Sequence, residues 1–367
     1  MSEMPDENNA LNRLRASMTE KELGVVAVME KVRGEYLPSG WDEDLRRAFD
    51  GLLRTVATRH DDQIDDEASE RRRETRALVV VGEAGTGKTE SLSRLFRTHP
   101  VLQGYGVLGS GCPLVTVSVP SPCTLKTLGI RLLRALGYPL ARDMREHLVW
   151  NLVFEHLELS GTLVLHLDEM HNLTDGANVA EIDTIQKTLK ALMVSPEWPV
   201  GLVVSGLPSI VPDLRAVEEI RRRGRFVRVP LLDIPGDLSS VAQVITHLAG
   251  IAGVTVEKDF AENTAPRLAH AGIHRFGIAV ELVHEAIEIA IADGVPLDLD
   301  TFATAYFDRT GVGDLLNPFV AVSWAEIDCS LILLDEAPPE QVLPADPRKR
   351  DRPKSRKNKG KHEKGGR

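Results

Sequence analysis

The sequence predicts an α/β fold in which a five-stranded parallel sheet lies between helices and is followed by a small all-helical domain. Five short apolar runs, separated by segments with helical periodicity, support it; they span 77–81, 114–119, 163–167, 200–204 and 226–229. Continuous apolar strands that alternate with helices are typical of a parallel sheet covered on both faces. A glycine-rich loop follows the first run, and after residue 233 only helical patterns remain.

The region before the first strand, residues 1–76, is expected to be helical and separate from the sheet. Apolar residues recur on one helical face between Trp41 and Val56, and the charged stretch 61–73 has the composition of an exposed connector. The opening residues are acidic and no apolar run follows them, so no secretory signal is expected. No stretch reaches the roughly 20 apolar residues of a membrane helix. We therefore expect a cytoplasmic protein.

The remaining boundaries follow from the change of pattern along the chain. We expect a nucleotide-binding domain at 77–233, a helical domain at 234–310, a C-terminal helical extension at 311–337 and a disordered basic tail at 338–367. Within that tail, residues 348–367 hold 11 Lys and Arg against 2 Asp and Glu, so the rest of the chain carries −19. Such an asymmetry indicates an interaction arm, with a disordered solubilising tail as the alternative.

Residues 82–89 read Gly-Glu-Ala-Gly-Thr-Gly-Lys-Thr, a complete phosphate-binding loop between a strand and a helix. Its glycines let backbone N–H groups point at phosphate oxygens, and the helix N-terminus adds partial positive charge. We expect Lys88 to reach the β- and γ-phosphates and the Thr89 hydroxyl to bind Mg²⁺. The sequence therefore predicts ATP binding, with contacts from Gly82, Glu83, Ala84, Gly85, Thr86, Gly87, Lys88, Thr89 and Glu90.

Two carboxylates, Asp168 and Glu169, follow the third apolar run, where ligand sites of open parallel sheets lie. Asp168 is expected to hold Mg²⁺ through water, and Glu169 to polarise the attacking water as general base. Ser205 ends the fourth run and is expected to sense the γ-phosphate, with a simple turn residue as the alternative. His166 and His171 flank the carboxylates without further metal ligands, so we expect His166 to pack and His171 to lie behind the site.

An arginine cluster at 221–225 precedes the last apolar run. An arginine supplied to a neighbouring subunit's nucleotide would stabilise transition-state charge, and Arg225 is the first choice for this role, followed by Arg222. A solvated basic patch or a contact to phosphodiester is the alternative. Arg275 in the helical domain is expected to reach the γ-phosphate. Tyr36 and Leu37 are expected to line an adenine pocket, with simple packing as the alternative.

These motifs, in this order and with a trailing helical lid, resemble those of AAA+ ATPases, a class of P-loop NTPases. Within that class the chain is most similar to the TniB/TnsC-type transposition regulators and also to the phage Mu B protein. The strings Asp-Glu-Met-His-Asn-Leu at 168–173 and Ser-Gly-Leu-Pro at 205–208 carry this resemblance, which spans about residues 37–307. Gly224 inside the arginine cluster and the insertion 103–112 depart from the pattern, and Gly224 leaves the register of the arginine open.

The resemblance implies a bacterial-type protein, encoded by a mobile element, that self-associates into a ring or filament on double-stranded DNA when ATP is bound. It further implies recruitment of a transposase and disassembly on hydrolysis. The implied DNA contacts are largely sequence-independent, and we place them at Thr124, Lys126, Lys187 and Lys190, with ordinary exposed residues as the alternative.

Two other functions stay open at this point. An ATPase of the same architecture could act on a protein partner without binding DNA, as the ExeA-type secretion ATPases do. A nucleotide-gated binding module with almost no turnover is the third alternative, although Lys88, Asp168 and Glu169 are all present.

Overall fold

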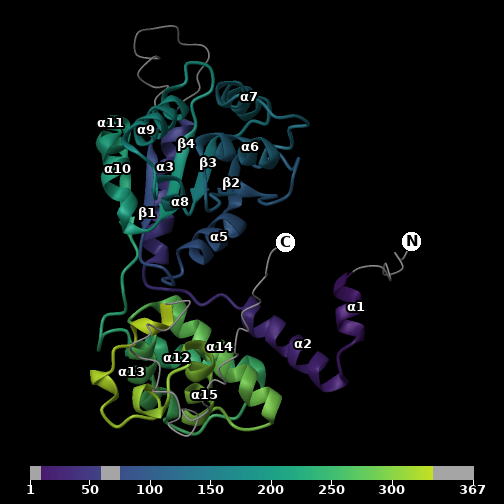
Figure 1. The fold of residues 1–367 in the computed structure, drawn as a ribbon, viewed down its shortest axis with the longest axis vertical. Coiled ribbons are helices and arrows are strands. Elements are labelled where there is room, and N and C mark those ends of the chain that lie inside the picture. Colours follow the sequence, from purple (N-terminus) through teal and green to yellow (C-terminus); the bar gives the residue numbers. More distant parts are fainter. Residues whose placement is uncertain (1–9, 59–74, 334–367) are drawn as a thin grey trace, which may run out of the picture.

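The computed structural model describes residues 10–58 and 75–333 (Figure 1). The predicted charged connector and the predicted basic tail lie outside these residues. None of the helices in the described ranges has the length and apolar character needed to cross a membrane.

Five parallel strands form one sheet in the order β2-β3-β4-β1-β5. They are β1 (Ala77–Val81), β2 (Leu114–Ser118), β3 (Val164–Asp168), β4 (Gly201–Gly206) and β5 (Arg225–Arg228). The predicted fold class is confirmed. Every residue of β1, β3 and β4 is buried, as the continuous apolar runs require. The register pairs Val81 with Gly206 and Ser118 with Asp168, so the phosphate loop and the carboxylate pair emerge at the same edge of the sheet.

Helices cover both faces of this sheet (Figure 1). One face carries α3 (Asp42–Ala57) and α5 (Lys88–Thr98), which share a core with Leu78, Val80 and Val203. The opposite face carries α6 (Leu125–Ala135), α7 (Glu146–Leu159), α8 (His171–Thr174), α9 (Val179–Val194), α10 (Val211–Ala216) and α11 (Glu218–Arg223). The alternation of side chains along each strand sends odd and even residues into these two cores.

The N-terminal region is not separate from the rest of the molecule, which corrects the expectation from the sequence. The apolar stripe of α3 packs on β1, β4 and β5, with Phe49 fully buried. The helix α2 (Glu20–Gly34) instead packs on the C-terminal helices, where Met29 and Val32 enter their core. Periodicity showed that α3 has an apolar face, but the partner of that face lies in strands far away in the chain.

Replacing Phe49 by alanine is expected to destabilise the protein by about 3–5 kcal/mol, the usual cost of removing a fully buried aromatic ring. The Phe49 ring is 0% exposed and lies 5.3 Å from the Phe96 ring and 5.5 Å from the His99 ring, centroid to centroid. Chemical denaturation measures the loss, with Arg46→Ala on the exposed side of α3 as control. A change below about 1 kcal/mol would mean that α3 does not belong to the core of the sheet.

Four helices form the lid below the sheet in Figure 1: α12 (Leu238–Ala252), α13 (Phe260–Ala271), α14 (Phe276–Asp293) and α15 (Leu299–Thr310). After α15 the described residues form only short 3-10 helices, η3 (Asp314–Leu316), η4 (Trp324–Glu326) and η5 (Ser330–Leu333). Phe319, Leu331 and Ile332 from this segment are buried in the lid core. The segment therefore completes the core of the lid.

A candidate nucleotide site between sheet and lid

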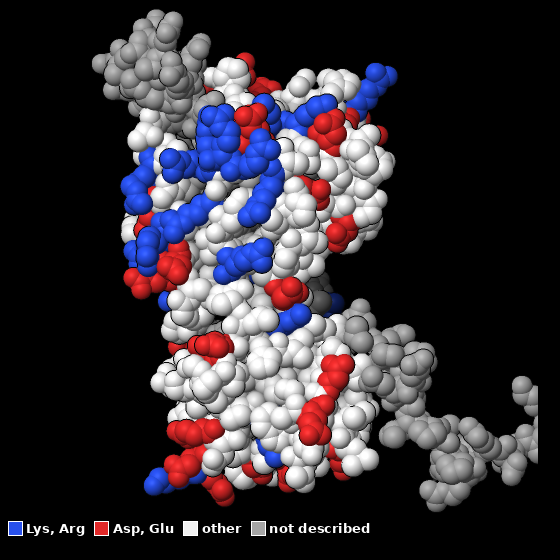
Figure 2. Space-filling view, turned by 90° about the vertical axis from the view of Figure 1, so that its left-hand side faces the viewer, with Lys and Arg blue, Asp and Glu red and all other residues white. Residues whose placement is uncertain are grey.

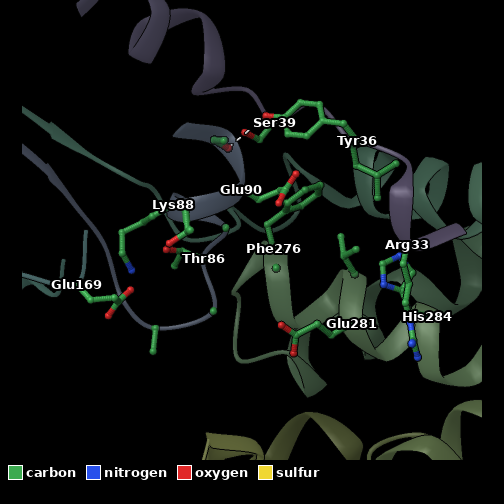
Figure 3. Close-up of a pocket in the computed structure, with 18 of the residues that line it drawn as sticks. Arg33, Tyr36, Ser39, Thr86, Lys88, Glu90, Glu169, Phe276, Glu281 and His284 are labelled. Carbon is green, nitrogen blue, oxygen red and sulfur yellow. Dashed lines mark hydrogen bonds between the residues drawn. The ribbon is translucent and has the colours of Figure 1, made fainter. Parts of the chain in front are cut away.

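A cavity of about 520 Å³ lies between the phosphate loop and the lid. Lys88 and Glu169 lie at one end of it, and Arg33 and His284 lie at the other (Figure 3). Most of its wall comes from three parts of the chain: the segment before α3, the phosphate loop with the start of α5, and one face of α14. They contribute Glu35, Tyr36, Leu37, Ser39, Ala84, Gly85, Thr86, Gly87, Thr89, Glu90, Ser91, Phe276, Gly277, Val280 and Glu281, among others.

The phosphate loop turns through two glycines in the left-handed region, Gly85 with φ 73° and Gly87 with φ 89°. The Lys88 side chain begins α5 and is only 6% exposed. Its Nζ donates hydrogen bonds to the carbonyl oxygens of Gly82 at 2.9 Å and Glu83 at 2.8 Å. Burial lowers the pKa of Lys88, while the charges of Glu169 and Asp168 oppose that shift. The loop thus presents a cation at the Glu169 end of the cavity.

Asp168 accepts hydrogen bonds from its neighbour Glu169 and from two residues that lie far away in the sequence. The Thr89 hydroxyl donates to Oδ2 at 3.0 Å, the Ser205 hydroxyl donates to Oδ1 at 2.5 Å, and the Glu169 N–H donates to Oδ1 at 3.0 Å. Hydroxyl and carboxylate oxygens are the ligands that Mg²⁺ prefers, so Thr89 and Asp168 fit the predicted metal role. Within the described ranges, no group of three or more His, Cys, Asp or Glu could hold a metal alone. In proteins Mg²⁺ is usually held by one or two carboxylates together with substrate phosphates and waters.

Glu169 adopts a left-handed backbone conformation, with φ 57°. This conformation is costly for a residue other than glycine, and such residues cluster at functional sites. The Oε2 atom of Glu169 lies 3.3 Å from Nε2 of His171, while the Met170 N–H donates to the carbonyl of Ser205. Glu169 and His171 both line the cavity, so the predicted general base faces the space where a γ-phosphate and water would lie.

The lid contacts the phosphate loop directly. Arg275 Nη1 donates to the carbonyl of Ala84 at 2.8 Å, and Nη2 lies 3.6 Å from the Glu83 carboxylate. The N–H of Ile278 donates to the carbonyl of Gly85 at 3.1 Å. The structure thus places Arg275 beside the loop, and its contact with a γ-phosphate stays a prediction.

Replacing Gly277 by alanine is expected to push the lid away from the phosphate loop. A Cβ at Gly277 would lie 2.6 Å from the carbonyl oxygen of Gly85 and 3.2 Å from the N atom of Gly87. Overpacking of this kind costs about 1–3 kcal/mol, so ATP affinity should fall by roughly 5- to 150-fold. Titration with a fluorescent ATP analogue measures the loss. Gly250→Ala in α12 is the matched control because its Cβ would meet no atom within 4 Å; equal affinities for both variants would disprove the close contact.

The cavity wall also includes aromatic and apolar side chains, which suit a nucleotide base. Tyr36 and Leu37 line the cavity, and their contact with an adenine stays a prediction. The Tyr36 hydroxyl donates to Asp42 at 2.6 Å and also lies 3.2 Å from the Ser91 hydroxyl oxygen, so the ring is held in place.

The lining residues missed from the sequence include Phe276, Val280 and His284 on α14. Their spacing of four residues, directly after Arg275, is a helical stripe that could have revealed them. The buried Nε2 of His284 has no hydrogen-bond partner among the described residues.

The predicted arginine-finger residues do not reach this cavity. Arg225 begins β5 beside Leu78, at the start of the strands, whereas the phosphate loop follows their carboxyl ends. Arg222 is exposed at the end of α11 and lies 3.3 Å from Glu218. Figure 2 shows a face of the sheet domain on which Lys and Arg side chains gather. The segments α10, α11 and β5 carry the exposed residues Arg215, Arg221, Arg222, Arg225 and Arg228. A contact with a neighbouring subunit's nucleotide stays a prediction.

The predicted DNA-contacting side chains all have partners inside the chain. Lys126 pairs with Asp143 at 2.6 Å, Lys187 with Asp183 at 2.6 Å and Lys190 with Glu219 at 2.9 Å. The Thr124 hydroxyl caps α6 by accepting a hydrogen bond from the N–H of Thr127. Phosphate groups would therefore compete with these carboxylates, and DNA contacts at the four positions stay a prediction.

His166 is buried, as expected, but it does more than pack. Its Nε2 lies 2.8 Å from the Ser205 hydroxyl and its Nδ1 lies 3.1 Å from the Thr116 hydroxyl. Burial lowers the pKa of His166 to about 4, against a smaller opposite effect of the Asp168 charge. The ring is therefore neutral near pH 7.

Comparison with known proteins agrees with this geometry. Residues 71–212 match a family model described as AAA domain. The fold is similar to Cdc6p from Pyrobaculum aerophilum, with 14% identity, a TM-score of 0.53, and coverage of 76% of this chain and 69% of that chain. It is also similar to the Orc1 protein of Aeropyrum pernix in complex with DNA, with 17% identity, a TM-score of 0.57, and coverage of 77% and 69%.

A comparison with curated protein sequences gives no significant match. AAA+ domains in general bind and hydrolyse nucleotides, typically with Mg²⁺. The parallel sheet, its phosphate loop and the helical lid are therefore a P-loop AAA+ fold, and the match to the AAA domain model covers residues 71–212 of it.

Proposed function

We propose that this chain is an ATP-dependent regulator of DNA transposition. It assembles on double-stranded DNA with ATP bound, recruits a transposase to the target and disassembles after hydrolysis. The observation that carries the ATPase function is that Lys88, Thr89 and Glu169 line one cavity and that Asp168 accepts a hydrogen bond from Thr89 directly behind it. The roles of DNA and transposase rest on the resemblance of residues 168–173 and 205–208 to the TniB/TnsC-type regulators.

In the proposed reaction the triphosphate lies in the phosphate loop and the base lies between Leu37 and Phe276. Lys88 exchanges the carbonyl oxygens of Gly82 and Glu83 for phosphate oxygens. This exchange is possible because both carbonyl groups belong to the phosphate loop itself. Mg²⁺ held by Thr89 and Asp168 would neutralise charge on the phosphates. Glu169 accepts a proton from the attacking water as the new P–O bond forms and the bond to ADP breaks. Ser205 keeps Asp168 oriented.

Self-association would couple this reaction to assembly. Arg225, with Arg222 as second choice, is proposed to contact the nucleotide of a neighbouring subunit, since both are exposed and neither lines the cavity of its own chain. An arginine supplied in this way makes the state of the γ-phosphate part of the subunit interface. Hydrolysis would then weaken the assembly.

A protein-directed ATPase of the same architecture remains the second candidate. The observation that favours it is the pairing of Lys126, Lys187 and Lys190 with carboxylates of the chain itself. Such an ATPase would assemble with ATP but would bind no DNA.

Binding to non-specific double-stranded DNA separates these candidates. It should be measured at low and moderate salt with a non-hydrolysable ATP analogue, with ADP and without nucleotide, and the same samples imaged by electron microscopy. We expect assemblies on DNA only with the ATP analogue, with binding that weakens as salt rises. Lys126→Ala should weaken binding, whereas Lys258→Ala on the exposed surface of the lid should not. Absence of DNA binding in every nucleotide state would exclude the transposition regulator in favour of the second candidate.

A further inference from the structure

A chain of side-chain hydrogen bonds runs through the sheet from the insertion 103–112 to the carboxylate at the nucleotide site. It crosses three neighbouring strands, β2, β3 and β4. The Tyr105 hydroxyl lies 2.8 Å from the Thr116 hydroxyl, which lies 3.1 Å from Nδ1 of His166. Nε2 of His166 lies 2.8 Å from the Ser205 hydroxyl, which donates to Asp168 at 2.5 Å. No other function described above uses Tyr105, Thr116 or His166.

Counting protons shows which atom is the donor in each hydrogen bond of this series. A serine hydroxyl carries a single proton, and Ser205 donates it to the Asp168 carboxylate. Ser205 must then accept from His166, so Nε2 of the ring carries the hydrogen. A neutral imidazole has only one N–H, so Nδ1 accepts the Thr116 proton. The Thr116 oxygen in turn accepts from the Tyr105 hydroxyl. Every polar atom in the chain is satisfied only in this arrangement.

The packing around the chain holds it in place. His166 is 2% exposed in the middle of β3, and Ser205 is fully buried. The Phe96 ring of α5 lies 5.2 Å from the His166 ring and 5.4 Å from the Tyr105 ring, both edge to face. Because α5 begins at Lys88, the helix that carries this lysine also packs Phe96 against the His166 and Tyr105 rings.

We propose that His166 is a positioning residue that holds Ser205 against Asp168, and that Thr116 and Tyr105 anchor its ring. Asp168 then keeps one oxygen for Ser205 and the other for Thr89. Without the His166 N–H, the Ser205 hydroxyl could turn away and Asp168 would lose a fixed orientation. The insertion 103–112 therefore helps to orient the hydrolytic site, since the hydroxyl of its Tyr105 begins the hydrogen-bond series at the edge of the sheet.

The kinetic test rests on the proposed ATPase activity and compares variants that remove or retain single hydrogen bonds. We expect His166→Leu to lower kcat by about 10- to 100-fold, with ATP affinity changed less than about 3-fold, because the loss falls on orientation rather than on binding. His166→Gln should restore most of kcat, since an amide N–H can donate to Ser205. Thr116→Val and Tyr105→Phe should each lower kcat by about 2- to 10-fold, the worth of one hydrogen bond.

Controls of the same chemistry separate positioning from general damage. Tyr138→Phe removes the hydroxyl of an exposed tyrosine, and His270→Gln replaces a histidine in the lid; both should leave kcat unchanged. Tyr105→Phe should lower kcat little further in the His166→Leu background, because both substitutions interrupt the same series of hydrogen bonds. Wild-type kcat in folded His166→Leu protein, or equal effects on kcat and affinity, would overturn the proposal.

Imidazole ¹⁵N spectra of the full-length protein test the same series of hydrogen bonds without measuring ATP hydrolysis. The His166 signals, assigned by their loss in His166→Gln, should show hydrogen on Nε2 and a bare Nδ1 that accepts a hydrogen bond. Thr116→Val should shift the Nδ1 resonance. Hydrogen on Nδ1 would overturn the proposal. If His166 has the predicted tautomer but the protein hydrolyses no ATP, the hydrogen-bond series is supported as a structural feature. That result would overturn the proposed function and not the series itself.

Discussion

Lys88→Ala protein is expected to lose about 10²- to 10³-fold in kcat/KM for ATP hydrolysis, the usual cost of deleting one preorganised donor to developing charge. The ammonium of Lys88 is the cation that the structure places beside Glu169 and Asp168, and it is already held by two loop carbonyls. Its removal leaves the phosphates without their nearest positive charge. Steady-state phosphate release and titration with a fluorescent ATP analogue measure the effect on turnover and on binding.

The control for this loss is Lys258→Ala, which removes an exposed lysine from the lid. Thermal unfolding without nucleotide should show that Lys88→Ala still folds, since the side chain packs on the loop rather than in either core. Wild-type kcat/KM in a folded Lys88→Ala protein would show that ATP does not occupy this loop.

Glu169→Gln protein is expected to bind ATP normally and to hydrolyse it about 10²- to 10⁴-fold more slowly, the usual contribution of a general base. Glutamine keeps the size of the side chain and its place in the cavity wall, but its amide cannot take the proton of the attacking water. Single-turnover hydrolysis separates this step from binding and product release. Under the proposed function, assemblies on DNA should also outlast those of the wild type, because the ATP-bound state persists.

Glu155→Gln on the exposed surface of α7 is the matched control for this substitution. Hydrolysis at the wild-type rate in Glu169→Gln would move the role of general base to another residue. His171, whose Nε2 lies 3.3 Å from the Glu169 carboxylate, is the nearest candidate in the cavity wall.

Much of the fold followed from local patterns. The apolar runs predicted all five strands to within two residues, because a fully buried strand must be apolar along its whole length. The phosphate loop was equally readable, since the order of its glycines, lysine and threonine encodes a backbone shape. The helical patterns expected after residue 233 were also correct, since α12 to α15 follow there.

The partners of each element were harder to predict. The apolar stripe on α3 was visible in the sequence, but its packing on β1, β4 and β5 was not. An apolar face shows that a helix is partly buried, and it does not show which element it packs against. His166 was expected only to pack, since nothing in the sequence says that Thr116 and Ser205 flank it on neighbouring strands. The wall formed by Phe276, Val280 and His284 was also missed, although their spacing of four residues marks one stripe of a helix.

The sequence by itself determined the strands, the phosphate loop, and the identity of Lys88, Thr89, Asp168 and Glu169 as the candidate chemical groups, because each depends on residue type and short spacing. Only the tertiary structure decided which groups meet. Strand order brings Asp168 and Ser205 within 2.5 Å of each other across 37 residues of chain, and the lid brings α14 onto the phosphate loop. Such contacts depend on how surfaces fit in three dimensions, and a single sequence contains no direct record of that fit.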